Sequence, residues 1–491
     1  VMIYMMFYYA GAGIYANIAL LINLLFIFGI LGAFKAVLTL PGIAGIVLTI
    51  AMSVDANVIV FERIKEELKL GKKLAQATAD GFKNALSSII DGNITIFLTA
   101  GILFFFGEGP VKGFATTLMI GILTSLFSAV LLSRYFMEKT IEKGGTITFS
   151  NSITKNWLSG LNIDFFAKKK LFYFISSVLT IISIVSLFTN KLNLGTDFKG
   201  GRSYVVRFEK PINPEQLGNE LSNLFIDEKG NKEILQVKTF GEANQVKIST
   251  KYKIDDESAK VEGEITSKIF QASKKYLPKN LTQQDFQSPT DKAKLGIMSY
   301  IKVGPTVADD ITIGAFIAVA LSLLVVFMYL FYSFKKWQYS LGAVLAVTHD
   351  VIIVLGVFSL FYSILPFSLE IDQAFIAAIL TVIGYSINDT VIVFDRIREN
   401  TTGVGISKNK NQSFKELVNY SINSTLGRTL NTSFLTLLVI IIIFFFGGEN
   451  IRGFMFALLV GIGVGTYSSI FIASLFMYEL VNKSDNKIKK S

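Results

Sequence analysis

Ten long apolar blocks, each near the length that crosses a lipid bilayer, dominate this 491-residue chain. A membrane-spanning helix needs roughly 17–25 predominantly apolar residues. Only 17% of the residues are charged and 51% are apolar or aromatic, which argues against a soluble enzyme. The sequence therefore predicts an α-helical polytopic membrane protein, with spans at 16–36, 40–62, 86–107, 111–136, 171–190, 309–332, 340–362, 372–394, 429–447 and 453–480.

The chain opens on one more apolar stretch, Val1–Ala12, which ends at the Gly11-Ala12-Gly13 break. Twelve helical residues cover about 18 Å, whereas the hydrocarbon layer is roughly 30 Å thick. We therefore expect the sequence to begin inside a span. Counting that partial span gives about 11 spans here and 12 in the complete protein.

Basic residues gather in alternate connections, and this pattern predicts the orientation of the chain in the membrane. The residues are dense in the loops 63–83, 134–170 and 395–428 and in the tail 483–491, and sparse in 107–113, 363–371 and 447–452. Lys and Arg favour the cytoplasmic side, so the dense loops and the C-terminus are expected there. The soluble-looking region 191–308 then lies outside. The net charge of +10 follows mostly from topology, so we expect no nucleic-acid partner.

Cysteine is absent and histidine occurs once, at position 349. These counts exclude disulfides, thiol catalysis, Cys-based zinc sites and His-rich metal sites. We expect no metal, no organic cofactor and no enzymatic chemistry of these classes.

Two stretches of sequence recur in the same order. SVDANVIVFERIKEE (53–67) matches SINDTVIVFDRIREN (386–400) at eight of fifteen positions, and FFFGEGPVKGFA (104–115) matches FFFGGENIRGFM (444–455) at six of twelve. The offset moves from 333 to 340, and both copies have the same topology. The pattern predicts two pseudo-symmetric helix bundles with a substrate or ion path at their interface.

The region 191–308 is expected to form a separate α+β domain. Its pattern predicts strands at 203–208, 233–241, 245–250 and 297–303, and helices at 213–225 and 258–276. The order βαββαβ indicates a ferredoxin-like fold. The stretch Gly195–Gly201 is better explained as a tight turn into the first strand than as a phosphate loop, because no helix is expected after its glycines.

The remaining boundaries follow from these features. We expect a first membrane bundle at 1–140, a cytoplasmic linker at 141–170, a first span of the second half at 171–190, a second bundle at 309–482 and a basic tail at 483–491.

Ionisable side chains inside predicted spans are the main candidates for function, because an unpartnered charge in a bilayer costs several kcal/mol. Asp55 and Asp389 lie at nearly the same depth in corresponding spans, although the repeat aligns Asp55 with Asn388 and Asp389 with Ala56. Arg428 opens the next predicted span of the second half. Two carboxylates and one guanidinium near a pseudo-symmetry axis suit a relay for protons or cations.

Other interpretations of these charges remain open. Asp55 and Asp389 could belong to a static ion pair that holds the halves together, although an isolated buried pair stabilises poorly. Arg428 could be an interfacial anchor. Secondary candidates are Asn388, Asn57, Asp91 as a supporting residue, and the pair His349 and Asp350, for which an interhelical hydrogen bond is the simpler role. At helix ends, solvated or snorkelling roles are expected for Glu62, Arg63, Asp395 and Arg396.

At these motifs the chain resembles the SecDF family, the fused accessory subunit of the bacterial Sec protein-export machinery. The resemblance rests on LPGIAGIVLTIAMSVDANVIVFERIKEEL (40–68), LGTDFKGG (194–201), HDV (349–351), GYSINDTVIVFDRIREN (384–400) and TLGRTLNTS (425–433). It implies the membrane fold of the resistance–nodulation–cell-division superfamily. The first span and the large first external domain of SecD have no counterpart in this sequence.

The resemblance also implies a function. Family members use the proton-motive force, or sodium in some cases, to pull polypeptide across the bacterial inner membrane, and the implied ion-transport residues are Asp55, Asp389 and Arg428. The implied partners are the SecYEG channel, preproteins driven by SecA, YajC, and YidC as a further candidate, together with membrane lipids. The implied coupling ion is H⁺ or Na⁺, and residues 191–308 would be periplasmic.

Two other functions are considered. One is an ion-driven exporter of small molecules or lipids from the same superfamily, but such exporters carry two large external domains and this chain has one small one. The other is an assembly factor that steadies the translocon without moving ions. Loss of ion-driven export on neutralising Asp55, Asp389 and Arg428 would favour the leading hypothesis.

Overall fold

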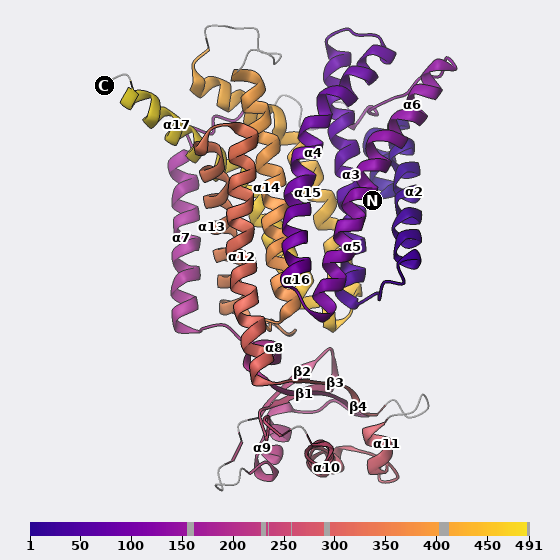
Figure 1. Cartoon of the computed structure of the whole chain (residues 1–491), viewed down its shortest axis with the longest axis vertical. Coiled ribbons are helices and arrows are strands. Elements are labelled where there is room, and N and C mark those ends of the chain that lie inside the picture. Colours follow the sequence, from indigo (N-terminus) through magenta and orange to yellow (C-terminus); the bar gives the residue numbers. More distant parts are fainter. Residues whose placement is uncertain are drawn as a thin grey trace.

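The computed structural model describes residues 1–154, 162–226, 232, 233, 235–256, 258–288, 295–401 and 412–488. Over these residues ten helices are long and apolar enough to cross a membrane. They form one bundle, and a small α+β domain extends from one end of it (Figure 1). The predicted helical membrane fold is confirmed. Parts of two predicted segments, residues 155–161 of the linker and 489–491 of the basic tail, lie outside the described residues.

The first half of the bundle contains α1 (Met2–Tyr9), α2 (Gly11–Ala33), α3 (Leu40–Lys69), α4 (Leu74–Phe106), α5 (Gly109–Leu126), the π-helix η1 (Phe127–Leu132) and α6 (Ser133–Glu142). The opening stretch breaks at Ala10, whose φ is 48°, one residue before the predicted break. A Cβ on Gly13 would lie 2.3 Å from the Met5 carbonyl oxygen. The glycine therefore permits α1 to fold back closely against α2.

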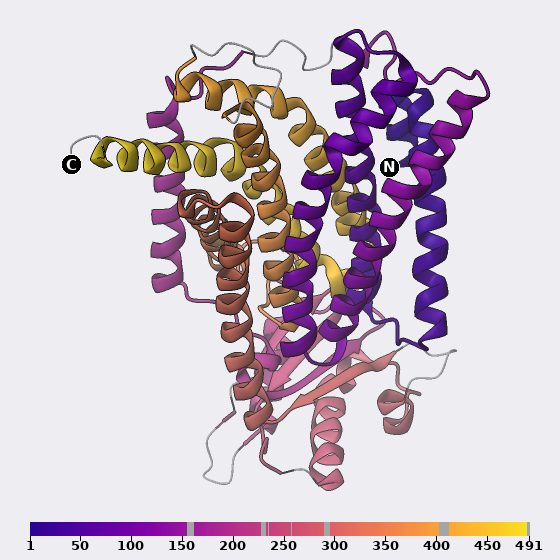
Figure 2. The same ribbon diagram turned by 45° about the horizontal axis from the view of Figure 1, so that its top comes forward.

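The second half repeats this arrangement. It contains α7 (Lys169–Thr189), α12 (Pro305–Phe334), α13 (Trp337–Phe361), α14 (Gln373–Thr401), α15 (Phe414–Phe446), α16 (Glu449–Ser468), the π-helix η4 (Ser469–Ala473) and α17 (Ser474–Ile488). Helices α4 and α15 both have 33 residues, and the two π-helices overlap at the offset of 340. After η4 the chain bends, and α17 turns aside across α7, to which Glu479 is joined through Lys169 at 3.1 Å (Figure 2).

Several helices extend beyond the apolar blocks. Helix α4 begins at Leu74 and α15 at Phe414, whereas the apolar blocks begin at 86 and 429. Ser413 and Glu416 form a capping box that starts α15. Arg428 thus stands at the start of the apolar block but not of the helix: it lies 14 residues after Phe414, the first residue of α15. Hydropathy detects only the apolar part of such a helix.

Two helices occupy the centre of the bundle. The apolar windows of α3 and α14 are 83% and 94% buried, whereas those of α7 and α12 are only 17% buried. Apolar side chains such as Phe188 and Phe316 on the outer helices are exposed, as expected for surfaces that face lipid. The helices that carry Asp55 and Asp389 are thus the two most enclosed.

The α+β domain has the predicted ferredoxin-like fold. Its elements are β1 (Gly201–Arg207), α9 (Pro214–Leu224), β2 (Gln236–Phe240), β3 (Glu242–Thr250), α10 (Ala259–Ser273), α11 (Gln283–Gln287) and β4 (Gly296–Val303). The strands pair antiparallel in the order β2-β3-β1-β4. The hairpin turns at Gly241, where φ is 81°, so β3 starts three residues before its predicted start. Helix α11 was not predicted.

The domain is attached to the N-terminal end of α14. The glycine-rich stretch turns through Gly200 into β1, as predicted, and it also contains a short helix, α8 (Thr196–Lys199), which was not predicted. Main-chain hydrogen bonds join Gly195 to Ile371 and Ile371 to Asn193, both at 2.8 Å. The Asp197 carboxylate accepts from the Gln373 amide at 3.0 Å. The first residues of α14 are therefore held by the domain.

Candidate functional site

Asp389 lies in the middle of α14 and is only 1% exposed. Its Oδ2 accepts a hydrogen bond from the Ser433 hydroxyl of α15 at 3.2 Å, and that hydroxyl in turn accepts one from Thr466 of α16 at 2.8 Å. One buried carboxylate thus connects three helices of the second half.

Asp55 lies at the corresponding depth of α3 and is 7% exposed. Its Oδ1 has no hydrogen-bond partner among the described residues. Arg428 lies on α15, which packs against both α3 and α14. The structure therefore places the three predicted ion-transport residues on neighbouring helices at the interface of the two halves. We call Asp55, Asp389 and Arg428 the buried triad.

Arg428 lies between the two carboxylate-bearing helices, because α15 packs against both α3 and α14. In the described part of the chain, its Nε and Nη2 atoms are buried without a hydrogen-bond partner. No ion pair within 4 Å joins its guanidinium to Asp55 or Asp389. Buried polar atoms that lack a partner are rare in folded proteins and call for an explanation.

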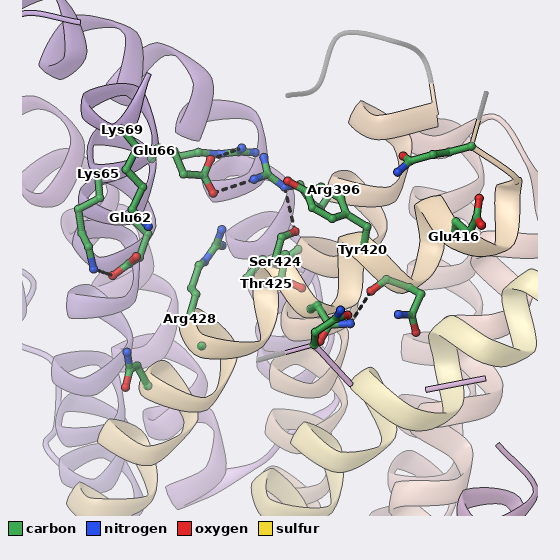
Figure 3. Close-up of a pocket in the computed structure, with 18 of the residues that line it drawn as sticks. Glu62, Lys65, Glu66, Lys69, Arg396, Glu416, Tyr420, Ser424, Thr425 and Arg428 are labelled. Carbon is green, nitrogen blue, oxygen red and sulfur yellow. Dashed lines mark hydrogen bonds and ion pairs between the residues drawn. The ribbon is translucent and has the colours of Figure 1, made fainter. Parts of the chain in front are cut away.

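A cavity of about 1030 Å³ reaches Arg428 (Figure 3). It lies where α3 ends, and this end of the bundle is opposite the α+β domain (Figure 1). We call it the vestibule. Its walls come from α3, α14 and α15 and from the segment before α7, and they include Glu62, Lys65, Asn423 and Asn431. Figure 3 shows Arg428 on α15 between Glu62 and Lys65 on one side and Arg396 and Ser424 on the other. The cavity gives water and ions a polar route to Arg428, whereas Asp55 and Asp389 do not line it.

Four charged residues form a ring of ion pairs in the wall of the vestibule. Arg63 bonds to Glu66 at 3.1 Å and to Glu399 at 2.6 Å, and Arg396 bonds to Glu399 at 3.1 Å and to Glu66 at 2.7 Å. We call these residues the charged ring. It fastens the ends of α3 and α14 to each other across the seam between the halves.

The expected solvated roles are therefore wrong for three of the four helix-end charges. Arg63 and Arg396 belong to the ring, and Arg396 is only 5% exposed. Asp395, 2% exposed, accepts from Ser88 and pairs with Arg398. Glu62 keeps the expected polar surroundings: it lines the vestibule, as Arg63 and Arg396 also do, and it binds Lys65 at 2.9 Å.

Two secondary candidates lie next to the seam. The side chain of Asn388 packs on Gly92 of α4 so closely that a Cβ there would lie 1.8 Å from its Oδ1. Asp91 accepts from Tyr329 at 2.6 Å and from Ser333 at 3.4 Å, which links α4 to α12. Asp91 therefore joins the two halves and makes no hydrogen bond to the buried triad.

The other secondary candidates form hydrogen bonds between helices. Asp350 is fully buried and accepts from Ser386 and Ser468, both at 2.7 Å, with the His349 ring 3.0 Å away. Asn57 accepts from Ser133 at 2.8 Å. These contacts agree with a structural interhelical bond at Asp350 and place Asn57 against α6.

The described residues contain no group of three His, Asp or Glu side chains arranged to hold a metal ion. Within the buried triad, the groups that a proton or Na⁺ could neutralise are the carboxylates of Asp55 and Asp389.

Comparison with known proteins relates both the bundle and the domain to protein export. A family model described as "Protein export membrane protein SecD/SecF, C-terminal" matches residues 1–143 and 283–483, and a model of the SecD/SecF GG motif matches residues 185–212. The second match covers the turn that attaches the α+β domain to α14.

Individual relatives agree with these matches. The chain is 35% identical over 477 residues to "Protein translocase subunit SecDF" of Brucella abortus, which covers 96% of this chain and 57% of the relative. It is 42% identical to "Protein translocase subunit SecF" of Rhodothermus marinus, over 65% of this chain and 93% of the relative. The crystal structure of SecDF from Thermus thermophilus, described as a translocon-associated membrane protein, superposes with a TM-score of 0.82 at 33% identity, over 98% of this chain and 60% of that one. The chain thus spans somewhat more than half the length of these SecDF relatives.

Proposed function

Since the chain belongs to the SecD/SecF family of protein export membrane proteins, we propose that it acts as a subunit of the Sec translocase and uses an ion gradient to drive late steps of preprotein translocation. The observation that carries the proposal is the buried triad at the interface of the two halves. A static ion pair would have its charges joined, but Asp55 Oδ1 and Arg428 Nε and Nη2 are left without partners. Incomplete pairing costs stability, and it suits groups that exchange an ion.

The ion exchange would act through the position of Arg428. Binding of H⁺ or Na⁺ to Asp55 or Asp389 removes the negative charge that holds the guanidinium between α3 and α14. The guanidinium then moves, and α15 shifts between the two central helices that it contacts. Because α14 is held at its outer end by Asp197 and the main chain of Ile371, such a shift would also move the α+β domain.

The proposal includes an orientation and a set of partners. The vestibule and the charged ring would face the cytoplasm of a bacterial cell, at its inner membrane, and residues 191–308 would face the periplasm. The SecYEG channel, preproteins driven by SecA, YajC and YidC are the proposed partners. In this arrangement the triad would release ions to the cytoplasm through the vestibule.

Ion-driven export into membrane vesicles tests the proposal. Vesicles that contain the Sec translocase and this chain are given ATP for initiation only, then a pH or Na⁺ gradient, and the protease-protected preprotein is measured. Asp55→Asn, Asp389→Asn and Arg428→Met should each remove the gradient-dependent part, whereas Asp309→Asn, an exposed acid at the start of α12, should not. Unchanged export in all three triad variants would exclude an ion-driven role and favour an assembly factor. Efflux of lipids or small molecules with export unaffected would favour the exporter.

A further inference from the structure

The internal repeat gives Arg428 a counterpart in the first half. Helices α4 and α15 both have 33 residues and correspond at an offset of 340, so Arg428 corresponds to Ser88. Helices α3 and α14 correspond at 333, so Glu62 corresponds to Asp395 and Lys65 to Arg398. The same pair of sites therefore occurs twice. In each case one half supplies a polar side chain, on α4 or α15, and the other half supplies an acid–base pair on its central helix, α14 or α3.

In one of these two places the contact across the seam is made. The Ser88 hydroxyl donates to the Asp395 carboxylate, which also binds Arg398, and both Ser88 and Asp395 are buried. Helix α14 packs closely along α4 here, far more extensively than α3 packs along α15. This side of the seam is closed.

In the equivalent place the contact is missing. Arg428 and Glu62 both line the vestibule, and no hydrogen bond joins them. Both hydrogen bonds that Glu62 accepts, from Tyr9 at 3.0 Å and from Lys65 at 2.9 Å, go to Oε1. Its Oε2 has no partner within the described ranges. The Arg428 side chain lines the same cavity (Figure 3), while its Nε and Nη2 atoms are buried without an acceptor. One acceptor without a donor and two donors without an acceptor therefore belong to side chains that line one cavity.

We infer that Glu62 is the second counter-ion of Arg428, to which the guanidinium moves when ion binding neutralises Asp55 and Asp389. A buried guanidinium that loses one anion must reach another anion or water. The Glu62–Arg428 contact would close the vestibule side of the seam as Ser88 and Asp395 close the other side. Glu62 is a positioning residue in this scheme, and the scheme rests on the proposed ion-driven function.

Glu66, the other acid near Arg428, is less suited to this role. Its two oxygens are already bound by Arg63 and Arg396, so it could bind Arg428 only by breaking the charged ring. Glu62 could bind Arg428 through Oε2 without breaking an existing hydrogen bond. Lys65 can be solvated in the vestibule that it lines.

A structure of the full chain carrying both Asp55→Asn and Asp389→Asn, which mimics the ion-loaded triad and leaves Glu62 intact, tests the inference directly. The expected result is an Arg428 guanidinium nitrogen at about 2.7–2.9 Å from Glu62, with a smaller vestibule. Adding Glu62→Gln should abolish this contact. A guanidinium that stays apart from Glu62 in the doubly neutral variant would overturn the inference.

The export assay supplies an independent measurement. Glu62→Gln should lower the maximal gradient-driven export rate about tenfold, which corresponds to an activation free energy raised by about 1.4 kcal/mol. The ion concentration for half-maximal export should change less than about twofold, because the ion-binding carboxylates are intact. Glu67→Gln is the matched control, since Glu67 lies on the same helix, binds Lys72 at 2.6 Å and does not line the vestibule.

The two hypotheses fail differently in this assay. If Glu62→Gln exports at the normal rate while Asp55→Asn and Asp389→Asn do not, the second counter-ion is excluded and the ion-driven function is retained. If the aspartate variants also export normally, the proposed function itself is excluded.

Discussion

Arg63 and Arg396 occupy the same position in the two copies of the internal repeat, and each bonds to the glutamate one turn along its own helix and to the glutamate of the other helix. The acids Glu66 and Glu399 are also equivalent, at the same offset of 333. The charged ring therefore lies on the pseudo-symmetry axis, with two positive and two negative charges. Because the charges of the ring sum to zero, the position of the nearby Arg428 guanidinium depends mainly on the charges of Asp55 and Asp389.

Glu66→Gln is expected to lower the free energy of unfolding by about 1–3 kcal/mol, because two largely buried arginines each lose a charged acceptor. Glu399→Gln should have a similar effect, since it occupies the equivalent position. Thermal unfolding in detergent measures both. Glu138→Gln is the control: its ion pair with Arg134 is 2.8 Å long but exposed, and such pairs contribute about 0.5 kcal/mol or less. Equal Tm values for Glu66→Gln and Glu138→Gln would show that the ring is not a stabilising element.

Gly92→Ala is expected to impair gradient-driven export more than it impairs insertion of the protein. The new Cβ would lie 1.8 Å from Asn388 Oδ1, so Asn388, next to Asp389, must move. Overpacking of this kind costs about 1–3 kcal/mol and here displaces α14 at the depth of the triad.

Gly101→Ala on the same helix is the matched control. A Cβ there has no atom within 4 Å. The change should stabilise α4 by about 0.5–1 kcal/mol and leave export unchanged. Normal export by Gly92→Ala would show that close packing of Asn388 on α4 is not required for the cycle.

Much of the fold follows from local sequence patterns. Apolar length locates all ten spans, and period-two and helical patterns locate the four strands and main helices of the α+β domain. The helix starts at Leu74 and Phe414 were missed because polar residues outside the bilayer extend a helix without a hydropathy signal.

The site was only partly predictable. The energetics of the bilayer single out Asp55 and Asp389, because a charged side chain in the middle of a span is costly and usually functional. The charged ring could not be predicted from either position alone, because a single arginine at a helix end also suits a solvated role. The repeat held the missing signal: it retains Arg and Glu three residues apart in both copies. The vestibule depends on how far α3 stands from α15, and no local pattern encodes that separation.

Arg202→Lys is expected to destabilise the α+β domain by about 2–4 kcal/mol. Arg202 is 1% exposed and donates to the carbonyl oxygens of Tyr252 and Lys253, at 2.8 and 3.0 Å, and of Asp256, at 2.8 Å. A lysine ammonium cannot reproduce the planar fork and would leave buried carbonyls without donors. Limited proteolysis of the loop at 251–256 measures the effect.

Arg207→Lys on the same strand serves as the control, because the side-chain bond of Arg207 is to Gln245 on the neighbouring strand, at 2.9 Å. The loop should then be cleaved at the normal rate. Faster cleavage in Arg207→Lys than in Arg202→Lys would contradict the role assigned to Arg202.

Asp372, at the junction of the α+β domain and α14, gives that junction a dependence on pH. Burial is the main cause that raises the pKa of Asp372 to about 6, and the nearby Asp197 and Glu370 carboxylates raise it further, against the Phe375 amide and Lys247. A raised acid pKa means that the folded state favours the protonated form. The resulting stability is complete below the unfolded pKa of about 3.9 and is lost as the pH rises through about 6.

Asp372→Asn removes this titration. It keeps a side-chain oxygen that can accept a hydrogen bond from the Phe375 amide, as the Asp372 carboxylate does at 2.8 Å. The variant and the natural protein should unfold at the same temperature near pH 4. The variant should become the more stable of the two as the pH rises from about 4 to 7, by at most about 2 kcal/mol because Asp372 is only partly buried. Thermal unfolding in detergent at pH 4, 5.5 and 7.5 measures the difference. A gap that shrinks as the pH rises would mean that the Asp372 carboxylate is stabilised in the folded junction, which is the opposite sign.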